Sequence, residues 1–206
     1  MLERFRKFWT NVFKPIAHLL IRLGVSPDTV TLVGTIGVVA GALAFFPRGE
    51  LLIGVLVITF FVFSDLIDGY MARTMGTSSK WGSFLDSTLD RLGDAAIFGV
   101  LTIWFFQGGD DDLLAYVGLW ALVMGSVTSY ARAKAESLGM TAKGGIAERS
   151  DRLVAVLAMA GLSDIFDLPI LLTITLWALA IASTITVIQR MLMVRKQAFA
   201  DPTLPQ

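Results

Sequence analysis

Long apolar runs, separated by short polar connections, make up most of this chain. They predict six helices, at residues 28–46, 51–73, 84–107, 112–137, 150–163 and 168–190. Several of these runs approach or exceed the ~20 residues that an α-helix needs to cross a hydrocarbon core ~30 Å thick. Because the connections are too short to hold another domain, we predict one all-α integral membrane domain of six transmembrane helices, over residues 24–196.

The two ends of the chain differ from this pattern. In residues 1–23, cations such as Arg4 and Lys14 alternate with large apolar residues such as Trp9 and Ile16. This alternation is typical of an amphipathic helix that lies in the membrane interface, and Pro15 should kink or break it. A plain basic lead-in to the first span is the alternative. Residues 197–206, which end in DPTLPQ, predict a disordered tail.

The composition also favours a membrane protein. Hydrophobic residues make up 55% of the chain and charged residues 17%, whereas soluble domains have about 45–50% and about 25%. The formal net charge of +0 excludes a globally basic nucleic-acid-binding protein. The absence of cysteine excludes disulfides, thiolate chemistry and cysteine-ligated metals.

Lysine and arginine are distributed unequally between the two predicted sides of the membrane. If the N-terminus is cytoplasmic, all of the 17 lysines and arginines except Arg48 fall on the cytoplasmic side, and Asp110–Asp112 fall on the other. By the positive-inside rule, this distribution predicts a multi-pass protein of the cell (plasma) membrane with both termini cytoplasmic. It also supports an even number of spans.

Four aspartates around one predicted turn form the main candidate site. Asp65 and Asp68 are three residues apart at the end of the second helix, and Asp86 and Asp90 are four apart at the start of the third. These spacings put each pair on one helix face, and the antiparallel helices bring both pairs to the cytoplasmic end. Because gathered carboxylates repel one another, we predict that they bind divalent cations such as Mg²⁺ or Mn²⁺, with room for two ions. The alternative is a set of helix-end acids that are hydrated or paired with Arg73 and Arg91.

The residues between the two pairs favour a phosphate-bearing ligand. Gly69 and Gly82 have no Cβ, so that backbone or ligand can approach closely. Arg73 can bind phosphate oxygens in a bidentate manner. The small polar loop at residues 74–80 could admit a head group from the cytoplasm.

Two further features receive a structural interpretation. Gly34, Gly37 and Gly41 form a stripe of small residues suited to close helix packing, most simply within the chain. Asp94 continues the face of Asp90 by one more turn, either as a group that supports the site or as a satisfied polar residue of the core.

The aspartates, glycines and arginine together resemble a known family signature. The string Asp65-x2-Asp68-Gly69-x2-Ala72-Arg73-x8-Gly82-x3-Asp86-x3-Asp90 is similar to the complete signature of the CDP-alcohol phosphotransferases, at all eight of its positions. This resemblance implies a membrane enzyme that uses a pair of divalent metal ions and displaces CMP from a CDP-alcohol with a second alcohol. It also implies a homodimer.

The resemblance assigns roles to individual positions. Asp65, Asp68 and Asp86 would be metal ligands, and Asp90 would be both a ligand and the general base for the acceptor hydroxyl. The contacts to the donor, CDP-diacylglycerol, would come from Asp28, Thr31, Gly69, Arg73 and Ser79. At Asp28 this sequence departs from the family, which often has asparagine there.

A basic rim around the predicted site bears on the acceptor. Arginines recognise phosphate well, and the candidates for an acceptor phosphate are Arg132, Lys134, Arg152 and Arg190. Loops on the cytoplasmic side are basic in any case, which is the simpler explanation. Ser129-Tyr130-x-Arg132 and Glu148-Arg149-x-Asp151-Arg152 resemble segments of the actinobacterial phosphatidylinositol phosphate synthases, particularly the mycobacterial ones.

That resemblance implies transfer of the phosphatidyl group from CDP-diacylglycerol to 1D-myo-inositol 3-phosphate. Glycerol 3-phosphate, as used by a phosphatidylglycerol phosphate synthase, is the main alternative acceptor. An ion transporter would place its aspartates near the membrane midplane on interrupted helices, and a prenyltransferase would carry two Asp-rich motifs far apart. One compact motif at the helix ends argues against both.

Overall fold

The computed structural model describes residues 2–200, with the backbone alone for residues 2–11. Every regular element of the described chain is a helix, as the apolar pattern predicts. Its elements are α1 (Leu2–Arg22), α2 (Pro27–Phe45), the short 3-10 helix η1 (Phe46–Arg48), α3 (Leu51–Val62), α4 (Ser64–Met75), α5 (Lys80–Gln107), α6 (Asp112–Ser137), α7 (Arg149–Ile165) and α8 (Ile170–Ala200).

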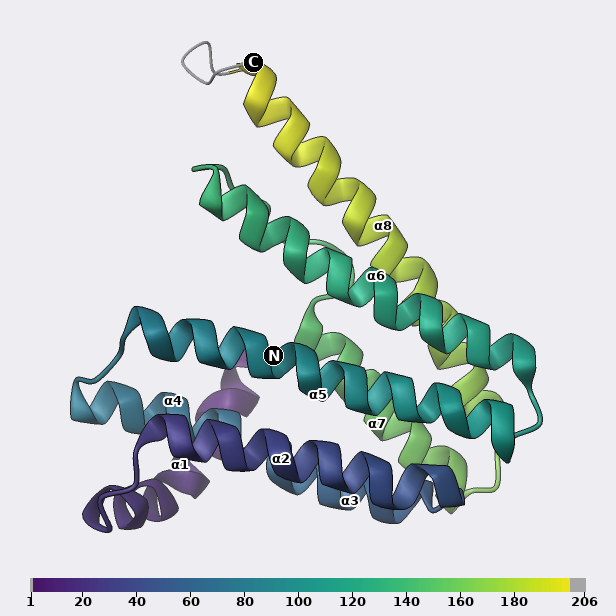
Figure 1. The fold of residues 1–206 in the computed structure, drawn as a ribbon, viewed down its shortest axis with the longest axis horizontal. Helices are drawn as coiled ribbons and strands as arrows, with labels where there is room; N and C mark the ends of the chain where they lie inside the picture. Colours follow the sequence, from purple (N-terminus) through teal and green to yellow (C-terminus); the bar gives the residue numbers. More distant parts are fainter. Residues whose placement is uncertain (1, 201–206) are drawn as a thin grey trace.

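Six helices pack side by side into a closed ring. In order around the ring they are α2, α5, α6, α8, α7 and α3, and α3 returns to α2. Figure 1 shows these helices running lengthwise between two ends of the bundle, with the α5–α6 and α7–α8 connections at the same end. At the opposite end lie α4, which continues α3, and the turn from α4 into α5.

Four of the described helical segments are long and apolar enough to cross a membrane. They are Pro27–Arg48, Leu51–Met75, Asp112–Ser137 and Ile170–Ala200. The predicted third and fifth spans form helices at the predicted places, α5 and α7, but do not meet this standard. The first half of α5 carries charged residues such as Asp86, Asp90 and Arg91, and the 17 residues of α7 extend only about 26 Å.

The predicted second span consists of two helices that meet at Phe63. The backbone tightens there, because the N–H of Leu66 bonds to the carbonyl of Phe63, three residues back, at 3.1 Å. The new helix, α4, starts at Ser64, directly before Asp65. The apolar span therefore ends where the candidate site begins.

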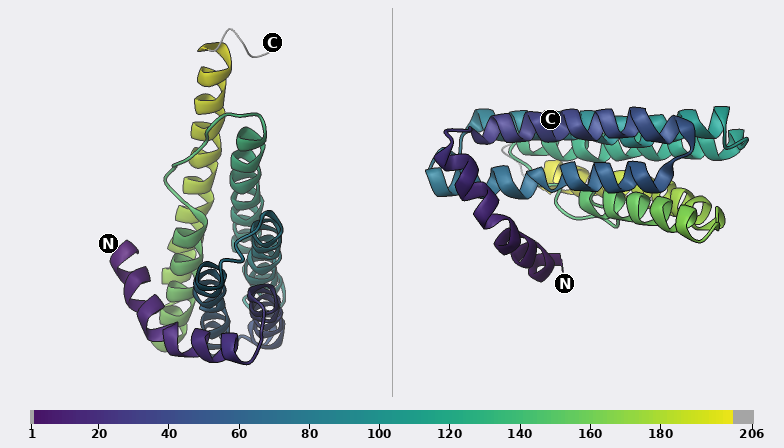
Figure 2. Two further views of the ribbon diagram at one scale, coloured as in Figure 1. Left: turned by 90° about the vertical axis from the view of Figure 1, so that its left-hand side faces the viewer. Right: turned by 90° about the horizontal axis from the view of Figure 1, so that it is seen from below.

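The N-terminal helix α1 packs against α4, outside the ring (Figure 2). His18 Nε2 lies 3.1 Å from the hydroxyl of Tyr70, and Lys14 Nζ lies 5.9 Å from the centre of the same ring. The helix continues through Pro15, so the chain does not break there, and the kink that the sequence also allowed stays a prediction. The amphipathic pattern predicted for residues 1–11 rests on side chains that lie outside the described part of the structure.

The predicted tail begins later than expected. Residues 197–200 belong to α8 because Gln197 anchors this turn to the loop before α7. Its Oε1 accepts from the backbone N–H of Thr141 at 2.9 Å, and its Nε2 donates to the carbonyl of Thr141 at 2.6 Å. Residues 201–206 lie outside the described part of the chain.

The glycine stripe packs α2 against α3 and α4, as predicted. A Cβ on Gly34 would lie 1.8 Å from Ser64 Oγ, and one on Gly37 would lie 2.2 Å from the ring of Phe61. Real Cβ atoms do not approach neighbours so closely, so these glycines set the separation between the helices. This close packing also brings the start of α2 next to α4.

We predict that Gly34→Ala destabilises the fold by about 1–3 kcal/mol, because the added methyl group overpacks the α2–α4 contact. Thermal unfolding in detergent measures the effect. Gly99→Ala is the matched control: its Cβ would lie 3.9 Å from Leu122, an ordinary contact, and alanine is the better helix former. Equal melting temperatures for the two variants would contradict this account of the packing.

Candidate active site

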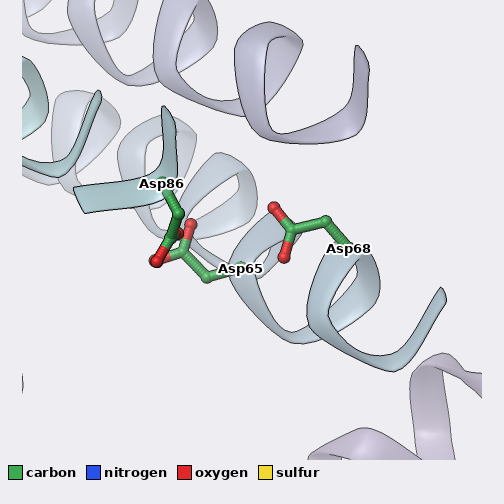
Figure 3. A group of neighbouring side chains, drawn as sticks. All are labelled: Asp65, Asp68 and Asp86. Atoms are coloured by element: carbon green, nitrogen blue, oxygen red, sulfur yellow. The ribbon is translucent and has the colours of Figure 1, made fainter. Parts of the chain in front are cut away.

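Three of the four predicted metal ligands come together between α4 and α5. One carboxylate oxygen each from Asp65, Asp68 and Asp86 lie within 4.8 Å of one another. Figure 3 shows the carboxylates of Asp65 and Asp68, from α4, turned toward Asp86, from α5. Three hard oxygen donors at this spacing fit Mg²⁺, Mn²⁺ or Ca²⁺. The donor set therefore suits the predicted metal.

Asp68 is the most deeply placed of the three, with a relative exposure of 7%. The hydroxyl of Thr31, from α2, lies 2.6 Å from its Oδ2 and 3.1 Å from the carbonyl of Pro27. The hydroxyl has one proton, which it donates to the closer acceptor, the carboxylate of Asp68. Thr31, predicted as a nucleotide contact, thus also fixes the orientation of a candidate metal ligand.

Asp90, the fourth predicted ligand, lies beside this cluster and pairs with Arg149. Arg149 Nη1 lies 2.7 Å from Asp90 Oδ1 and 3.5 Å from Asp65 Oδ2. Arg91 Nη2 is also 3.8 Å from Asp90 Oδ2. Of the two arginines that the sequence offered as alternative partners, Arg91 therefore pairs with Asp90, whereas the main partner of Asp90 and Asp65 is Arg149, which the sequence did not indicate as a partner.

Asp94 extends the charged network one turn further along α5. Its carboxylate is almost fully buried and lies 3.1 Å from Arg149 Nε, 3.4 Å from Arg91 Nη2 and 3.7 Å from Arg152 Nη2. The sequence left the role of Asp94 open and pointed to Arg149 only as part of the segment Glu148-Arg149-x-Asp151-Arg152. Asp94 was itself the sequence signal for such a partner, because a carboxylate inside an apolar helix requires a nearby cation.

A cavity of about 510 Å³ opens beside the three clustered carboxylates. Its lining includes all of the residues predicted to contact the donor: Asp28, Thr31, Gly69, Arg73 and Ser79. Ser79 caps α5 by accepting the N–H of Gly82 at 3.0 Å. Asp28 accepts from Trp81 Nε1 at 3.1 Å, so the start of α2 is tied to the start of α5 across the cavity mouth.

A second, larger cavity of about 990 Å³ is lined by Asp90. Five arginines line it, and Ser83 lines both cavities. These arginines are Arg91, Arg132, Arg149, Arg152 and Arg190. Of the residues predicted to bind an acceptor phosphate, Lys134 is absent from the lining, and the other three are present.

Two of these three arginines already make backbone hydrogen bonds. Arg152 donates to the carbonyls of Ala147 and Gly125, each at 3.3 Å. Arg190 donates to the carbonyl of Thr128 at 2.6 Å and that of Gly144 at 3.1 Å. Both therefore shape the cavity wall.

Arg132 is exposed and pairs at 3.0 Å with Glu136, one turn further along α6. Of the three predicted arginines in the lining, Arg132 therefore has the guanidinium that is most available to bind a ligand.

The fold is that of a known class of transferase. Residues 24–145 match the CDP-alcohol phosphatidyltransferase family, and the chain belongs to this family. The phosphatidylinositol phosphate synthase of Streptomyces avermitilis is 51% identical over 205 residues, which cover 96% of this chain and 84% of that protein. The same enzyme of Mycolicibacterium smegmatis is 46% identical over 192 residues, covering 92% and 86%.

Solved structures of a relative show the same fold. The Mycobacterium tuberculosis phosphatidylinositol phosphate synthase PgsA1 with CDP-DAG bound superimposes with a TM-score of 0.87 at 41% identity, covering 95% of this chain and 98% of that chain. The same protein in complex with manganese and citrate gives a TM-score of 0.85 at 42% identity, covering 93% and 91%.

We predict that Thr31→Val weakens Mn²⁺ binding about tenfold, because it removes the hydrogen bond that orients Asp68. Thr31→Ser keeps the hydroxyl and should bind Mn²⁺ like the wild type. Thr35→Val, which removes a hydroxyl bonded only to the carbonyl of Thr31, controls for the loss of a threonine from α2. Isothermal titration of each purified variant makes the comparison, and equal affinities for Thr31→Val and Thr35→Val would refute the role of Thr31.

Proposed function

We propose that this enzyme transfers the phosphatidyl group of CDP-diacylglycerol to 1D-myo-inositol 3-phosphate and releases CMP. The observation that carries the proposal is a pair of cavities that share Ser83 and are lined by the predicted metal-binding aspartates, Asp65, Asp68 and Asp86 in one and Asp90 in the other. One is lined by the predicted donor contacts and the other by five arginines. The relatives named phosphatidylinositol phosphate synthase support the choice of reaction.

The cavity beside the three-carboxylate cluster suits the donor. Arg73 lines it and can bind phosphate oxygens through its guanidinium fork. Gly69 leaves the face of α4 open, because the nearest side-chain atom to a Cβ there would be Arg73 Nη1 at 3.4 Å. A ligand phosphate could therefore reach both Arg73 and the cluster. The relative with CDP-DAG bound supports this donor.

We assign Asp65, Asp68, Asp86 and Asp90 as the ligands of two divalent ions, Mg²⁺ or Mn²⁺. When bound, such ions neutralise the pyrophosphate and stabilise the charge that develops on the transferring phosphoryl group. The relative solved with manganese and the spacing of Asp65, Asp68 and Asp86 support a divalent metal.

We assign Asp90 as the general base. It lines the arginine-rich cavity, where the acceptor would bind. In the proposed step, an acceptor hydroxyl oxygen attacks the phosphorus that bears the diacylglycerol, and its proton passes to Asp90. The bond from that phosphorus to the oxygen of CMP breaks, and CMP leaves with both electrons of that bond. Holding donor and acceptor in line contributes much of the acceleration.

The arginine-rich cavity favours a phosphorylated acceptor. Arg132 is the least committed of the predicted arginines, and Arg152 and Arg190 supply positive charge from the wall. Glycerol 3-phosphate would also satisfy a basic pocket. The volume of the cavity, about 990 Å³, leaves room for the larger inositol ring.

The membrane placement forms part of the proposal. We propose that α5 and α7 complete six spans in the plasma membrane, with both termini and the site on the cytoplasmic side. The ring in which α5 and α7 pack between apolar helices supports this arrangement. We further propose that α1 lies in the interface, since Val12, Ile16 and Leu19 are exposed apolar residues at helical spacing on it. A homodimer is proposed from the family resemblance.

We expect Asp90→Asn to lower CMP release at least about 100-fold, because a general base contributes 10²- to 10⁴-fold to the rate. Release of CMP from CDP-diacylglycerol measures turnover. Asp110→Asn makes the same change in the exposed α5–α6 loop, far from the site, and should retain full activity. Near wild-type turnover in a folded Asp90→Asn protein would eliminate Asp90 as the base.

A panel of acceptors tests the proposed reaction. Purified enzyme receives CDP-diacylglycerol and Mg²⁺ or Mn²⁺ together with inositol 3-phosphate, inositol, glycerol 3-phosphate or serine. We expect CMP release and a phosphorylated phosphatidylinositol product with inositol 3-phosphate. If only glycerol 3-phosphate supports CMP release, the enzyme is instead a phosphatidylglycerol phosphate synthase.

A further inference from the structure

One arginine side chain bridges three carboxylates from two helices. Arg149, the first residue of α7, contacts Asp90 and Asp65 through Nη1, at 2.7 and 3.5 Å, and Asp94 through Nε, at 3.1 Å. Its side chain is 25% exposed. The guanidinium thus lies between Asp65, a member of the three-carboxylate cluster, and Asp90, which stands outside that cluster.

We infer that Arg149 is an internal counter-cation that competes with a divalent metal ion for the carboxylates of Asp65 and Asp90. The inference rests on the proposed function, which assigns both residues as metal ligands. It adds an order to metal binding. A first ion can bind to Asp65, Asp68 and Asp86 with Arg149 in place, and a second ion on Asp65 and Asp90 requires the guanidinium to move.

Competition follows from the space and the charge at these two carboxylates. Mg²⁺ and Ca²⁺ bind carboxylate oxygens at about 2.0–2.6 Å, and Nη1 lies within 3.5 Å of an oxygen on both Asp65 and Asp90. An ion bridging the two residues would occupy the place of the guanidinium group. Two positive charges held so close in a partly buried site also repel one another.

Neutralising Asp94 does not by itself account for the position of Arg149. Arg91 and Arg152 already lie 3.4 and 3.7 Å from the oxygens of Asp94. Among the ion pairs of the described residues, the one that reaches Asp65 comes from Arg149. The arginine is therefore directed at the metal-binding carboxylates.

The contact with Asp94 keeps Arg149 near the site when it moves. Nε is bonded to Asp94, while Nη1 makes the contacts to Asp65 and Asp90. The start of α7 is fixed by a capping box between Glu148 and Asp151. Because Arg149 also lines the arginine-rich cavity, a guanidinium displaced by a metal ion stays on the wall of the proposed acceptor site.

Mn²⁺ titration of the purified full-length protein in detergent, followed by electron paramagnetic resonance and without nucleotide, tests the inference. We expect Arg149→Gln to bind a second Mn²⁺ at least about tenfold more tightly than the wild type. Structural damage would weaken metal binding, so a gain in affinity separates competition from a scaffold role. Unchanged or weaker binding of the second ion would overturn the inference.

Arg91→Gln is the matched control for charge. Arg91 also lies near Asp90 and Asp94 but donates to the hydroxyl of Ser129 and forms no ion pair with Asp65. We expect its loss to tighten the second site by less than about threefold. Equal tightening in both variants would show a general charge effect and would also overturn the inference.

Two further comparisons complete the test. Arg149→Lys keeps the positive charge but lacks the second nitrogen branch of the guanidinium. If Arg149→Gln does not fold, an intermediate gain in affinity for the second Mn²⁺ in Arg149→Lys supports competition, and no gain refutes it. Wild-type protein that binds no Mn²⁺, or binding unaffected by Asp68→Asn, would refute the metal assignment of the proposed function instead. Normal wild-type binding with no gain on loss of Arg149 would refute the inference alone.

Discussion

The compensation of negative charge between α4, α5 and α7 is the constraint on which this structure depends. Asp65 and Asp90 share one nitrogen of Arg149, and buried Asp94 is surrounded by three arginines. Carboxylates at these separations would repel strongly in the low dielectric of a membrane protein without nearby cations. The arginines supply part of the positive charge, and a metal on the three-carboxylate cluster would supply the rest.

The helix ring serves this constraint by bringing distant parts of the chain together. Close packing at Gly34 sets α2 against α4, and this contact allows Thr31 to reach Asp68. On the other side, Arg190 joins α8 to the backbone of α6 and of the loop that leads to α7. These contacts hold the helices that line the cavity beside the three carboxylates and the arginine-rich cavity, which share Ser83.

Much of this arrangement could be predicted from the sequence, because its signals are local. The apolar runs located the helices to within a few residues, except at the end of α8, and the spacings of Asp65, Asp68 and Asp86 correctly predicted that these three carboxylates come together. The partners of the carboxylates were not predictable in the same way. Arg149 is 84 positions from Asp65, and only the packing of α7 shows that it contacts the site rather than the basic rim. The extension of α8 through Gln197 likewise depends on a contact across 56 positions.

The central claim is that the clustered carboxylates of α4 and α5 bind the catalytic metal ions. Anomalous scattering at the manganese edge from crystals grown with Mn²⁺ measures this most directly. The account predicts a peak within coordinating distance of Asp65, Asp68 and Asp86. A peak confined to another acidic group, such as Asp110–Asp112 at the opposite end of the bundle, would contradict it.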